Sequence, residues 1–375
     1  MKFIRWTYIL AMLLAMLTAA CNGKGDEPPV SPLPGEPVML TLDVRSIESS
    51  MGTRTDSDYE ENDTTGFELP ATVFENMHSV RVIIVRPDGT VEANRYTPVS
   101  DAGIFEFPDE MTMKVASGET KKIYVVANED AVPYRFSDIM INDIFPEEEV
   151  INIQLSREKN RPLFDNSGIG RTYIPMSEIF DVEVKTPVNE EDFHQSVSLF
   201  VTRAAVKFSF ELQGVPDLPV NNLYIKDISI TGIADKEYLF PHNTIYKPGK
   251  YQPSSNSLNG RFITSYSIPA DADTIGYTFN LPDGLLSATT EKKSYIPYIY
   301  LPESPEQSYT VKINTGGGTS QFPGFYNEVQ LPNLPSLPRN THVRVIMTLT
   351  GPHTLDMEVK VMPYLSVTLD PSFGI

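Results

Sequence analysis

The stretch MHSVRVIIVRPDGTVEANRY, residues 77–96, contains the pattern that decides the fold. Two runs rich in β-branched and alternating residues flank the tripeptide Pro87-Asp88-Gly89. Proline fixes a φ angle that suits a turn, and glycine adopts positive φ without a steric cost. The stretch therefore predicts two antiparallel strands joined by a tight turn.

The same order of strand, turn and strand recurs along the chain. Residues 111–130, MTMKVASGETKKIYVVANED, place a Ser-Gly turn between two apolar runs, and a second series of alternating runs begins near Val197. Short strands at intervals of roughly 8–15 residues, separated by proline, glycine and asparagine, are typical of β-sandwiches. No long segment has the 3.6-residue period of an amphipathic helix. Residues 147–156 are expected to form another strand, and residues 136–145 a short helix.

The chain is therefore predicted to be all-β, with two β-sandwich domains of Greek-key type in series. A length of 375 residues fits two domains of about 150 residues each. The N-terminal sandwich is expected over residues 55–188 and the C-terminal sandwich over residues 189–363. Their boundary is placed in the polar stretch at residues 182–195.

The balance of charges excludes several classes of partner. The formal net charge is −19, and it becomes −21 when a signal segment containing Lys2 and Arg5 is removed, which leaves 28 basic against 49 acidic residues. A surface of this sign repels nucleic acid and anionic lipid. Neither is expected as a partner.

The N-terminus has the pattern of an exported lipoprotein. Basic residues precede the apolar run YILAMLLAMLTAA, which ends at Cys21, so residues 1–20 are expected to be a signal peptide. Cys21 is the only cysteine, which excludes an internal disulfide, and small residues before it resemble a lipidation signal. The alternative is cleavage after Ala20 that leaves a free thiol. Residues 21–37 are rich in proline and glycine and are expected to be a tether.

A search for catalytic and cofactor sites finds none. The sequence has no H-E-x-x-H, G-x-S-x-G or P-loop motif. The five histidines are scattered, with no pair at metal-ligand spacing. We therefore expect no enzyme activity, no cofactor and no metal. Residues 294–300, SYIPYIY, are compatible with a sugar-binding face, although aromatic cross-strand pairs are the commoner reason for such a run.

The first strand is followed by an unusual segment. In residues 39–62, MLTLDVRSIESSMGTRTDSDYEEN, Leu40, Leu42 and Val44 alternate with polar residues, as in a half-buried strand. The residues that follow are mostly small and acidic and surround Arg54. The pattern predicts a good strand attached through an exposed, protease-accessible segment.

Several phrases, in this order, resemble the fimbrillins, the lipoprotein precursors of type V pili in Bacteroidales. The phrases are KKIYVVANED (121–130), RTYIPMSEIF (171–180), LFVTRAAVKFSFEL (199–212), LPRNTHVRVIMTLTG (337–351) and MEVKVMPYLSV (357–367). The sequence departs from the family at Glu178, where glycine is common, at Val343, where tyrosine is common, and at Tyr364, where tryptophan is usual. The resemblance implies two transthyretin-like sandwiches and assembly by strand exchange.

The resemblance also implies a role for the first strand. Residues 38–54 would be removed by an arginine-specific protease, with cleavage after Arg54 or, alternatively, after Arg45. The groove left behind would accept a C-terminal strand of a neighbouring subunit by β-augmentation. The strand residues that would fill the groove are Val38, Leu40, Leu42 and Val44. The donor is expected in residues 364–375, through Leu365, Val367 and Leu369. Residues 355–361 are a second candidate, and both segments are also compatible with ordinary last strands.

The predicted function is that of a structural subunit, stalk or tip, of a type V pilus that supports adhesion. Its expected partners are other pilus subunits, an arginine-specific protease, outer-membrane lipid through the acylated precursor and a host ligand. Its expected location is the cell surface, in the fimbrium or the outer membrane. Two alternatives stay open: a lipidated anchor subunit at the pilus base, and an unpolymerised surface lipoprotein that binds glycan or a host protein.

Overall fold

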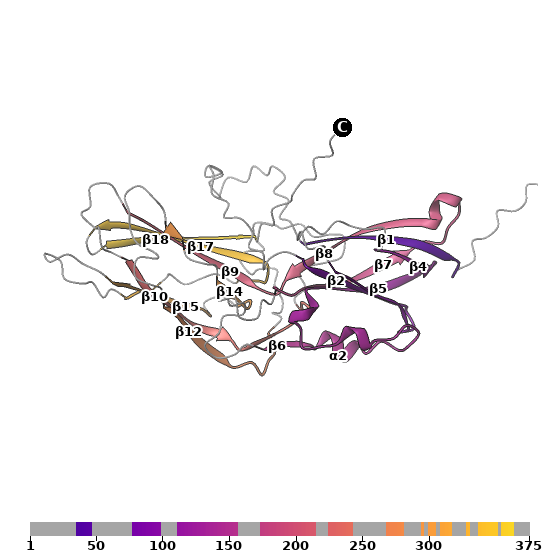
Figure 1. Cartoon of the computed structure of the whole chain (residues 1–375), viewed down its shortest axis with the longest axis horizontal. Coiled ribbons are helices and arrows are strands. Elements are labelled where there is room, and N and C mark those ends of the chain that lie inside the picture. Colours follow the sequence, from indigo (N-terminus) through magenta and orange to yellow (C-terminus); the bar gives the residue numbers. More distant parts are fainter. Residues whose placement is uncertain are drawn as a thin grey trace, which may run out of the picture.

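The computed structural model describes twelve segments of the chain. They are residues 35–46, 77–98, 111–156, 173–214, 224–242, 268–280, 294–295, 299–304, 308–316, 328–330, 337–351 and 354–363. Within them the molecule is all-β with mostly antiparallel strand pairing, which confirms the predicted fold class. Apart from β6, which pairs with β11, strands up to β8 gather at one end of the molecule and strands from β9 onward at the other (Figure 1).

The first group of strands forms one seven-stranded sheet. Its order is β3-β2-β5-β7-β8-β1-β4. The bounds are β1 (Pro37–Ser46), β2 (Ser79–Val85), β3 (Val91–Pro98), β4 (Thr112–Ala116), β5 (Glu119–Ala127), β7 (Met176–Val184) and β8 (His194–Arg203). One hydrophobic cluster joins the inward side chains of β1, β2, β4, β5, β7 and β8. The sheet therefore curves around a single core.

The hairpin predicted from residues 77–96 is present as β2 and β3. Gly89 has a φ of 84° and donates its N–H to the Arg86 carbonyl at 2.9 Å, and the Asp88 carboxylate accepts from the Thr90 N–H at 2.9 Å. Every residue of β2 is buried, because the strand is covered on both faces. A strand that is buried on both faces has a continuous run of apolar residues in its sequence, here VIIV at residues 82–85.

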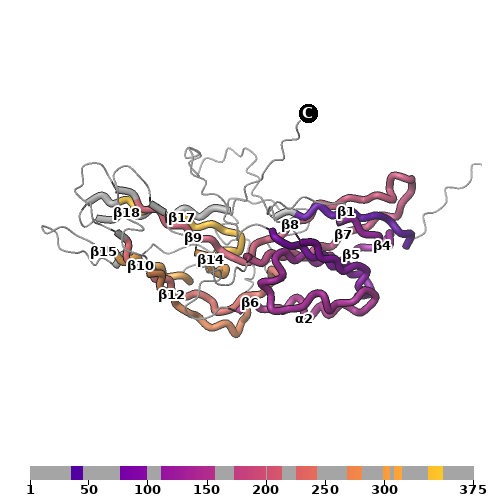
Figure 2. Tube along the Cα trace, viewed as in Figure 1, coloured from indigo at the N-terminus to yellow at the C-terminus, as the bar shows by residue number. Residues whose placement is uncertain are grey.

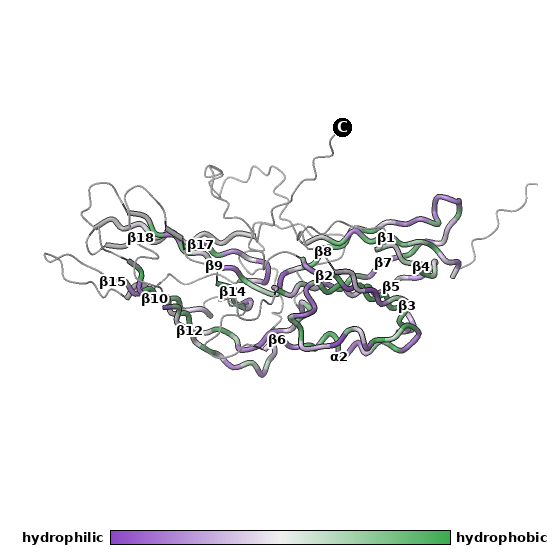
Figure 3. Tube along the Cα trace, viewed as in Figure 1, coloured by the Kyte–Doolittle hydropathy of each residue, from purple (hydrophilic) through white to green (hydrophobic). Residues whose placement is uncertain are grey.

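The outer face of β2 and β5 is covered by residues 129–156, which we call the cap. It contains η3 (Glu129–Ala131), η4 (Phe136–Asp138), α2 (Glu147–Ile151) and β6 (Gln154–Ser156). Its apolar side chains form a second core with Tyr124 and Val126 of β5 and with Leu239 and Phe240 from farther along the chain. The trace in Figure 2 follows the cap along one face of the sheet, and Figure 3 shows hydrophobic and hydrophilic residues alternating along it.

Residues 147–151 form a helix where a strand was expected. Three glutamates, Glu147 to Glu149, occupy its first turn. Acidic side chains at a helix N-terminus interact favourably with the helix dipole. The expected strand is confined to β6, and the expected helix at residues 136–145 is reduced to the single 3₁₀ turn η4.

The second group of strands forms two facing sheets. Strands β13, β9, β17 and β18 make one sheet, with β14 also paired to β9, and β12, β10, β15 and β16 make the other. The bounds are β9 (Val206–Gly214), β10 (Tyr224–Ala234), β12 (Thr274–Asn280), β13 (Ser294–Tyr295), β14 (Ile299–Leu301), β15 (Thr310–Gly316), β16 (Glu328–Gln330), β17 (Thr341–Gly351) and β18 (Thr354–Pro363). Side chains from β9, β10, β14, β15 and β17 fill the core between the sheets. This is a β-sandwich.

The sheets do not divide the chain where the sequence placed the boundary. Strand β8, assigned to the C-terminal half by the division at residues 188 and 189, pairs with β1 and β7 in the seven-stranded sheet. Its apolar residues Leu199 and Val201 belong to the core of that sheet. The polar run at residues 185–193 is a connection within the first group, and its composition does not distinguish it from a linker. The number of domains stays a prediction.

Candidate functional site

The N-terminal strand β1 lies inside the seven-stranded sheet. It pairs antiparallel with β4, from Pro37 opposite Ala116 to Thr41 opposite Thr112. It pairs parallel with β8, from Met39 opposite His194 to Ser46 opposite Val201. The strand therefore has a partner on each edge (Figure 1).

The side chains described for β1 alternate between a buried and a more exposed face. All four residues proposed for the removable strand are at most 1% exposed: Val38, Leu40, Leu42 and Val44. Between them Thr41 is exposed, and its hydroxyl hydrogen-bonds the Thr112 hydroxyl at 2.9 Å. Burying an aliphatic side chain contributes about 1.5–3 kcal/mol, so the four together contribute on the order of 6–12 kcal/mol.

Strand β4 depends on β1 for its place in the sheet. It lies at the end of the strand order, and β1 is the one described strand whose backbone pairs with it. Ahead of β1, Gly35 donates its N–H to the Ser117 carbonyl at 2.9 Å, and Ser117 donates to the Glu36 carbonyl at 3.0 Å. Loss of β1 would expose backbone hydrogen-bonding groups on both β4 and β8, which costs free energy unless another strand replaces it.

Of the two candidate cleavage residues, only Arg45 lies within the described residues. The backbone of Arg45 is in the ladder of β1, opposite Phe200 of β8. Proteases need an accessible, locally unfolded backbone, so this position is protected while β1 is in place. Arg54 lies outside the described residues, and so does the lipidation candidate Cys21.

The two candidate donor segments also differ. Residues 364–375, with Leu365, Val367 and Leu369, lie outside the described residues. Residues 355–361 form most of β18, which pairs antiparallel with β17 from Thr354 to Pro363 and is the last strand of its sheet. This segment is an integral sheet strand of its own chain.

A buried ionic cluster lies within the second group of strands. The guanidinium of Arg339, just before β17, donates to the carbonyls of Leu239 and Tyr238, both at 2.7 Å. Its Nε lies 3.6 Å from a carboxylate oxygen of Glu303, and its Nη2 lies 4.0 Å from one of Glu237. All three charged side chains are fully buried. Beside the cluster, β6 pairs with β11 (Lys236–Tyr238), which joins the cap to the second group.

Glu178 of β7 lies at the edge of this cluster. Burial raises the pKa of its carboxyl group to about 8, and nearby Arg339 lowers it only in part. One carboxyl oxygen accepts the Ile179 N–H at 3.2 Å, and Oε2 has no hydrogen-bond partner among the described residues. The group is therefore largely protonated at neutral pH.

Sequence reasoning did not find the ionic cluster. Its acids lie in unrelated stretches of the chain, and the phrase that contains Arg339 indicates a family resemblance but no ion pair. One signal was available, because Glu178 occupies a position where the resembled family commonly has glycine. A charged residue at such a place in a strand indicates a local specialisation.

The described segments contain neither a metal-binding cluster nor a membrane-spanning helix. No group of three or more histidine, cysteine, aspartate and glutamate side chains there is arranged to hold a metal ion. In the same residues, no helix is long and apolar enough to cross a membrane.

The fold of this chain is similar to that of a solved fimbrial protein. No family model matches the chain, and no curated protein matches it in sequence. Among solved structures it resembles the C-terminally truncated tip fimbrial protein Mfa3 from Porphyromonas gingivalis, with a TM-score of 0.51 and 11% identity over 88% of this chain and 100% of that one. A candidate cell adhesion protein from Parabacteroides distasonis gives a TM-score of 0.49 and 13% identity over 88% and 98% of the chains. Another from Bacteroides eggerthii gives 0.48 and 13% over 89% and 98%.

The similarity to Mfa3 shows a shared fold. It extends over the whole of that chain and nearly nine-tenths of this one. At 11% identity, however, it shows no more than the fold. The resemblance to fimbrial proteins inferred from short phrases is thus confirmed at the level of the fold.

Proposed function

We propose that this protein is a structural subunit, stalk or tip, of a type V pilus at the bacterial surface, and that it has no enzymatic role. In this proposal it is exported as a lipoprotein precursor acylated at Cys21. An arginine-specific protease then removes residues up to Arg54, and a C-terminal strand from a neighbouring subunit takes the place of β1. The observation that carries the proposal is β1, a strand that is buried on one face, paired on both edges and positioned at the N-terminal end of the described chain.

The physics of β1 supports replacement rather than simple loss. Its apolar residues repeat every second position, so a donor with the same alternation would fill the same pockets. Leu365, Val367 and Leu369 have that spacing. β1 must stay in the sheet until cleavage, and a donor strand must then replace it. An empty groove would leave apolar surface and two unpaired strand edges exposed.

The first experiment is the determination of the N-terminus of protein recovered from sheared surface material, by intact mass and terminal sequencing. A chain that begins at Thr55, or at Ser46 if Arg45 is cut, is the expected result. A chain that begins at acylated Cys21 contradicts removal of β1 and favours the anchor or the unpolymerised lipoprotein. An anchor must keep the connection between lipid and fold, so cleavage separates the two roles.

A double variant tests the two arginines directly. Arg54→Ala combined with Arg45→Ala is expected to stop protease-dependent polymerisation, measured as ladders of oligomers after protease treatment. Each single variant shows which arginine is used. Normal polymerisation of the double variant would overturn cleavage at these positions.

A further inference from the structure

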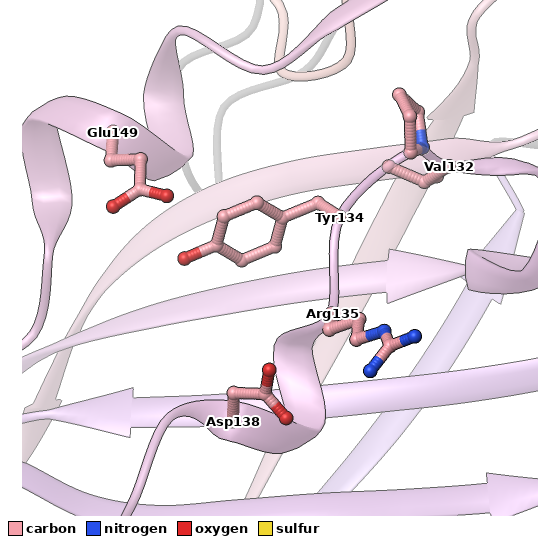
Figure 4. Close-up of a pocket in the computed structure, with 6 residues that line it drawn as sticks. Val132, Tyr134, Arg135, Asp138 and Glu149 are labelled. Atoms are coloured by element: carbon pink, nitrogen blue, oxygen red, sulfur yellow. The ribbon is translucent and has the colours of Figure 1, made fainter.

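The cap carries a shallow hollow on its outer surface, around the chain that joins η3 to η4 (Figure 4). Its volume is about 470 Å³, which is within the usual range for small-molecule sites. The lining residues are Val132, Pro133, Tyr134, Arg135, Asp138 and Glu149.

Tyr134 is the central group of the hollow. Its ring makes an edge contact with Phe136, with centroids 4.9 Å apart and planes at 62°, and Phe136 belongs to the core beneath the cap. In Figure 4 the ring lies between Glu149 on one side and Arg135 and Asp138 on the other. The pKa of the Tyr134 hydroxyl is raised, first by burial and then by Glu149 and Asp138, which places both carboxylates near the ring. The ring therefore packs against the core beside it and has polar groups around it.

The polar groups around Tyr134 are available to a ligand. Arg135, Asp138 and Glu149 are all exposed. The side chains of Arg135 and Glu149 have no ion pair or hydrogen bond within the described segments, and Asp138 has only a 3.4 Å contact with the Ser137 hydroxyl. The hollow therefore combines one aromatic ring packed on the core, one donor group and two acceptor groups.

We propose that this hollow binds a neutral pyranose sugar. The C–H face of a pyranose packs on an aromatic ring through dispersion contacts, and its hydroxyl groups both donate and accept hydrogen bonds. The carboxylates of Asp138 and Glu149 accept, and the Arg135 guanidinium donates. Two negative charges against one positive, on a chain of net charge −19, disfavour sugars that carry a carboxylate.

Binding at a single open hollow is weak, with a Kd on the order of millimolar for a monosaccharide. Copies repeated along a polymer would raise the effective affinity through multivalency. That gain rests on the proposed pilus function, whereas binding by one chain does not. A purified, unpolymerised protein is therefore the right sample for the test.

The test is saturation-transfer-difference NMR with methyl glucoside, methyl galactoside, methyl mannoside and N-acetylglucosamine, with glucuronate and N-acetylneuraminate as anionic comparators. We expect binding of at least one neutral sugar and weaker binding of both anionic ones. Tyr134→Ala and Glu149→Gln should each reduce the affinity at least tenfold. Glu148→Gln is the matched control, because Glu148 neighbours Glu149 on α2 but does not line the hollow.

A thermal unfolding curve for each variant shows whether it is folded. If Tyr134→Ala is not folded, Tyr134→Phe keeps the ring, and Arg135→Met together with Glu149→Gln tests the polar groups alone. Absence of binding to all neutral sugars at 10–20 times the expected ~1 mM Kd would overturn the proposal. Equal binding by wild type and the hollow variants, or tighter binding of the anionic sugars, would also overturn it. A protein that binds sugar but does not polymerise would contradict only the pilus function.

Discussion

Glu178 is a single carboxyl group whose burial sets a pH dependence for the whole molecule. Its folded-state pKa, about 8, is above the ordinary value of 4.5. Between pH 4.5 and about pH 8, the Glu178 carboxyl group is therefore protonated in the folded state and ionised in the unfolded chain. Stability associated with this group is fully present below about pH 4.5 and is lost as the pH rises through about 8.

Glu178→Gln should remove this dependence, because glutamine keeps the shape and does not ionise. One pKa unit corresponds to about 1.4 kcal/mol, so wild type should lose a few kcal/mol of unfolding free energy between pH 6 and pH 9 relative to the variant. Urea unfolding at both pH values measures the difference. If the unfolding free energy changed equally with pH in the two proteins, Glu178 would not be protonated in the folded state.

Arg339 is the cation on which the buried cluster depends. Arg339→Met should destabilise the protein by about 3–5 kcal/mol, because Glu303 and Glu237 would stay buried without it. Lys236→Met is the control, since Lys236 pairs with an Asp271 side chain that is 74% exposed and should cost less than about 1 kcal/mol. Denaturant unfolding of both variants compares them. Similar losses would mean that burial does not distinguish the two ion pairs.

Strand β1 is the element that relates stability to the proposed assembly. It contributes four buried side chains to the core and holds β4 in the sheet. The same contacts must resist loss before cleavage and be reproduced by a donor afterward. A donor that fills fewer pockets would give a weaker joint between subunits.

Leu42→Ala should cost about 2–5 kcal/mol of unfolding free energy, because it leaves a cavity beneath a fully buried position. Thr41→Ala, one residue earlier on the exposed face, should cost about 1 kcal/mol through its hydrogen bond to Thr112. Urea unfolding of the uncleaved protein gives both values. Equal losses of unfolding free energy in the two variants would contradict the burial of one face of β1.

At the scale of the whole molecule, the two groups of strands repeat one pairing pattern. In the first, β4-β1-β8-β7 pair antiparallel, parallel and antiparallel in turn. In the second, β14-β9-β17-β18 do the same. The repetition supports the proposal of two similar domains, which the pairing of β6 with β11 joins.

Net charge should control the rate of assembly. The chain that remains after cleavage at Arg54 has 25 basic and 44 acidic residues, so its charge is still −19. Like-charged subunits repel at low ionic strength, and salt screens the repulsion over a Debye length of about 8–10 Å at 0.1–0.15 M. Polymerisation of cleaved protein, followed by light scattering, should accelerate between 20 and 200 mM NaCl. Slower assembly in salt would mean that attractive charge pairs dominate the subunit joint.

The sequence by itself determined the features that depend on local pattern. The turn at Pro87-Asp88-Gly89, the two-residue period of β1 and the all-β class all follow from residues close together in the chain. Leu40, Leu42 and Val44 could be assigned to a buried face because successive strand residues point to opposite sides. Residues close together in the chain were enough to predict these three features.

Only the tertiary structure decided the long-range features. The parallel pairing of β1 with β8 joins residues some 155 positions apart, and no local pattern selects that partner. The buried set of Arg339, Glu303 and Glu237 likewise combines residues from separate segments. The hollow brings together Tyr134 and Glu149 from different elements of the cap. Charged residues look alike in a sequence whether they are solvated or buried. Their roles are set by the neighbours that folding brings to them, because desolvation and pairing act through space.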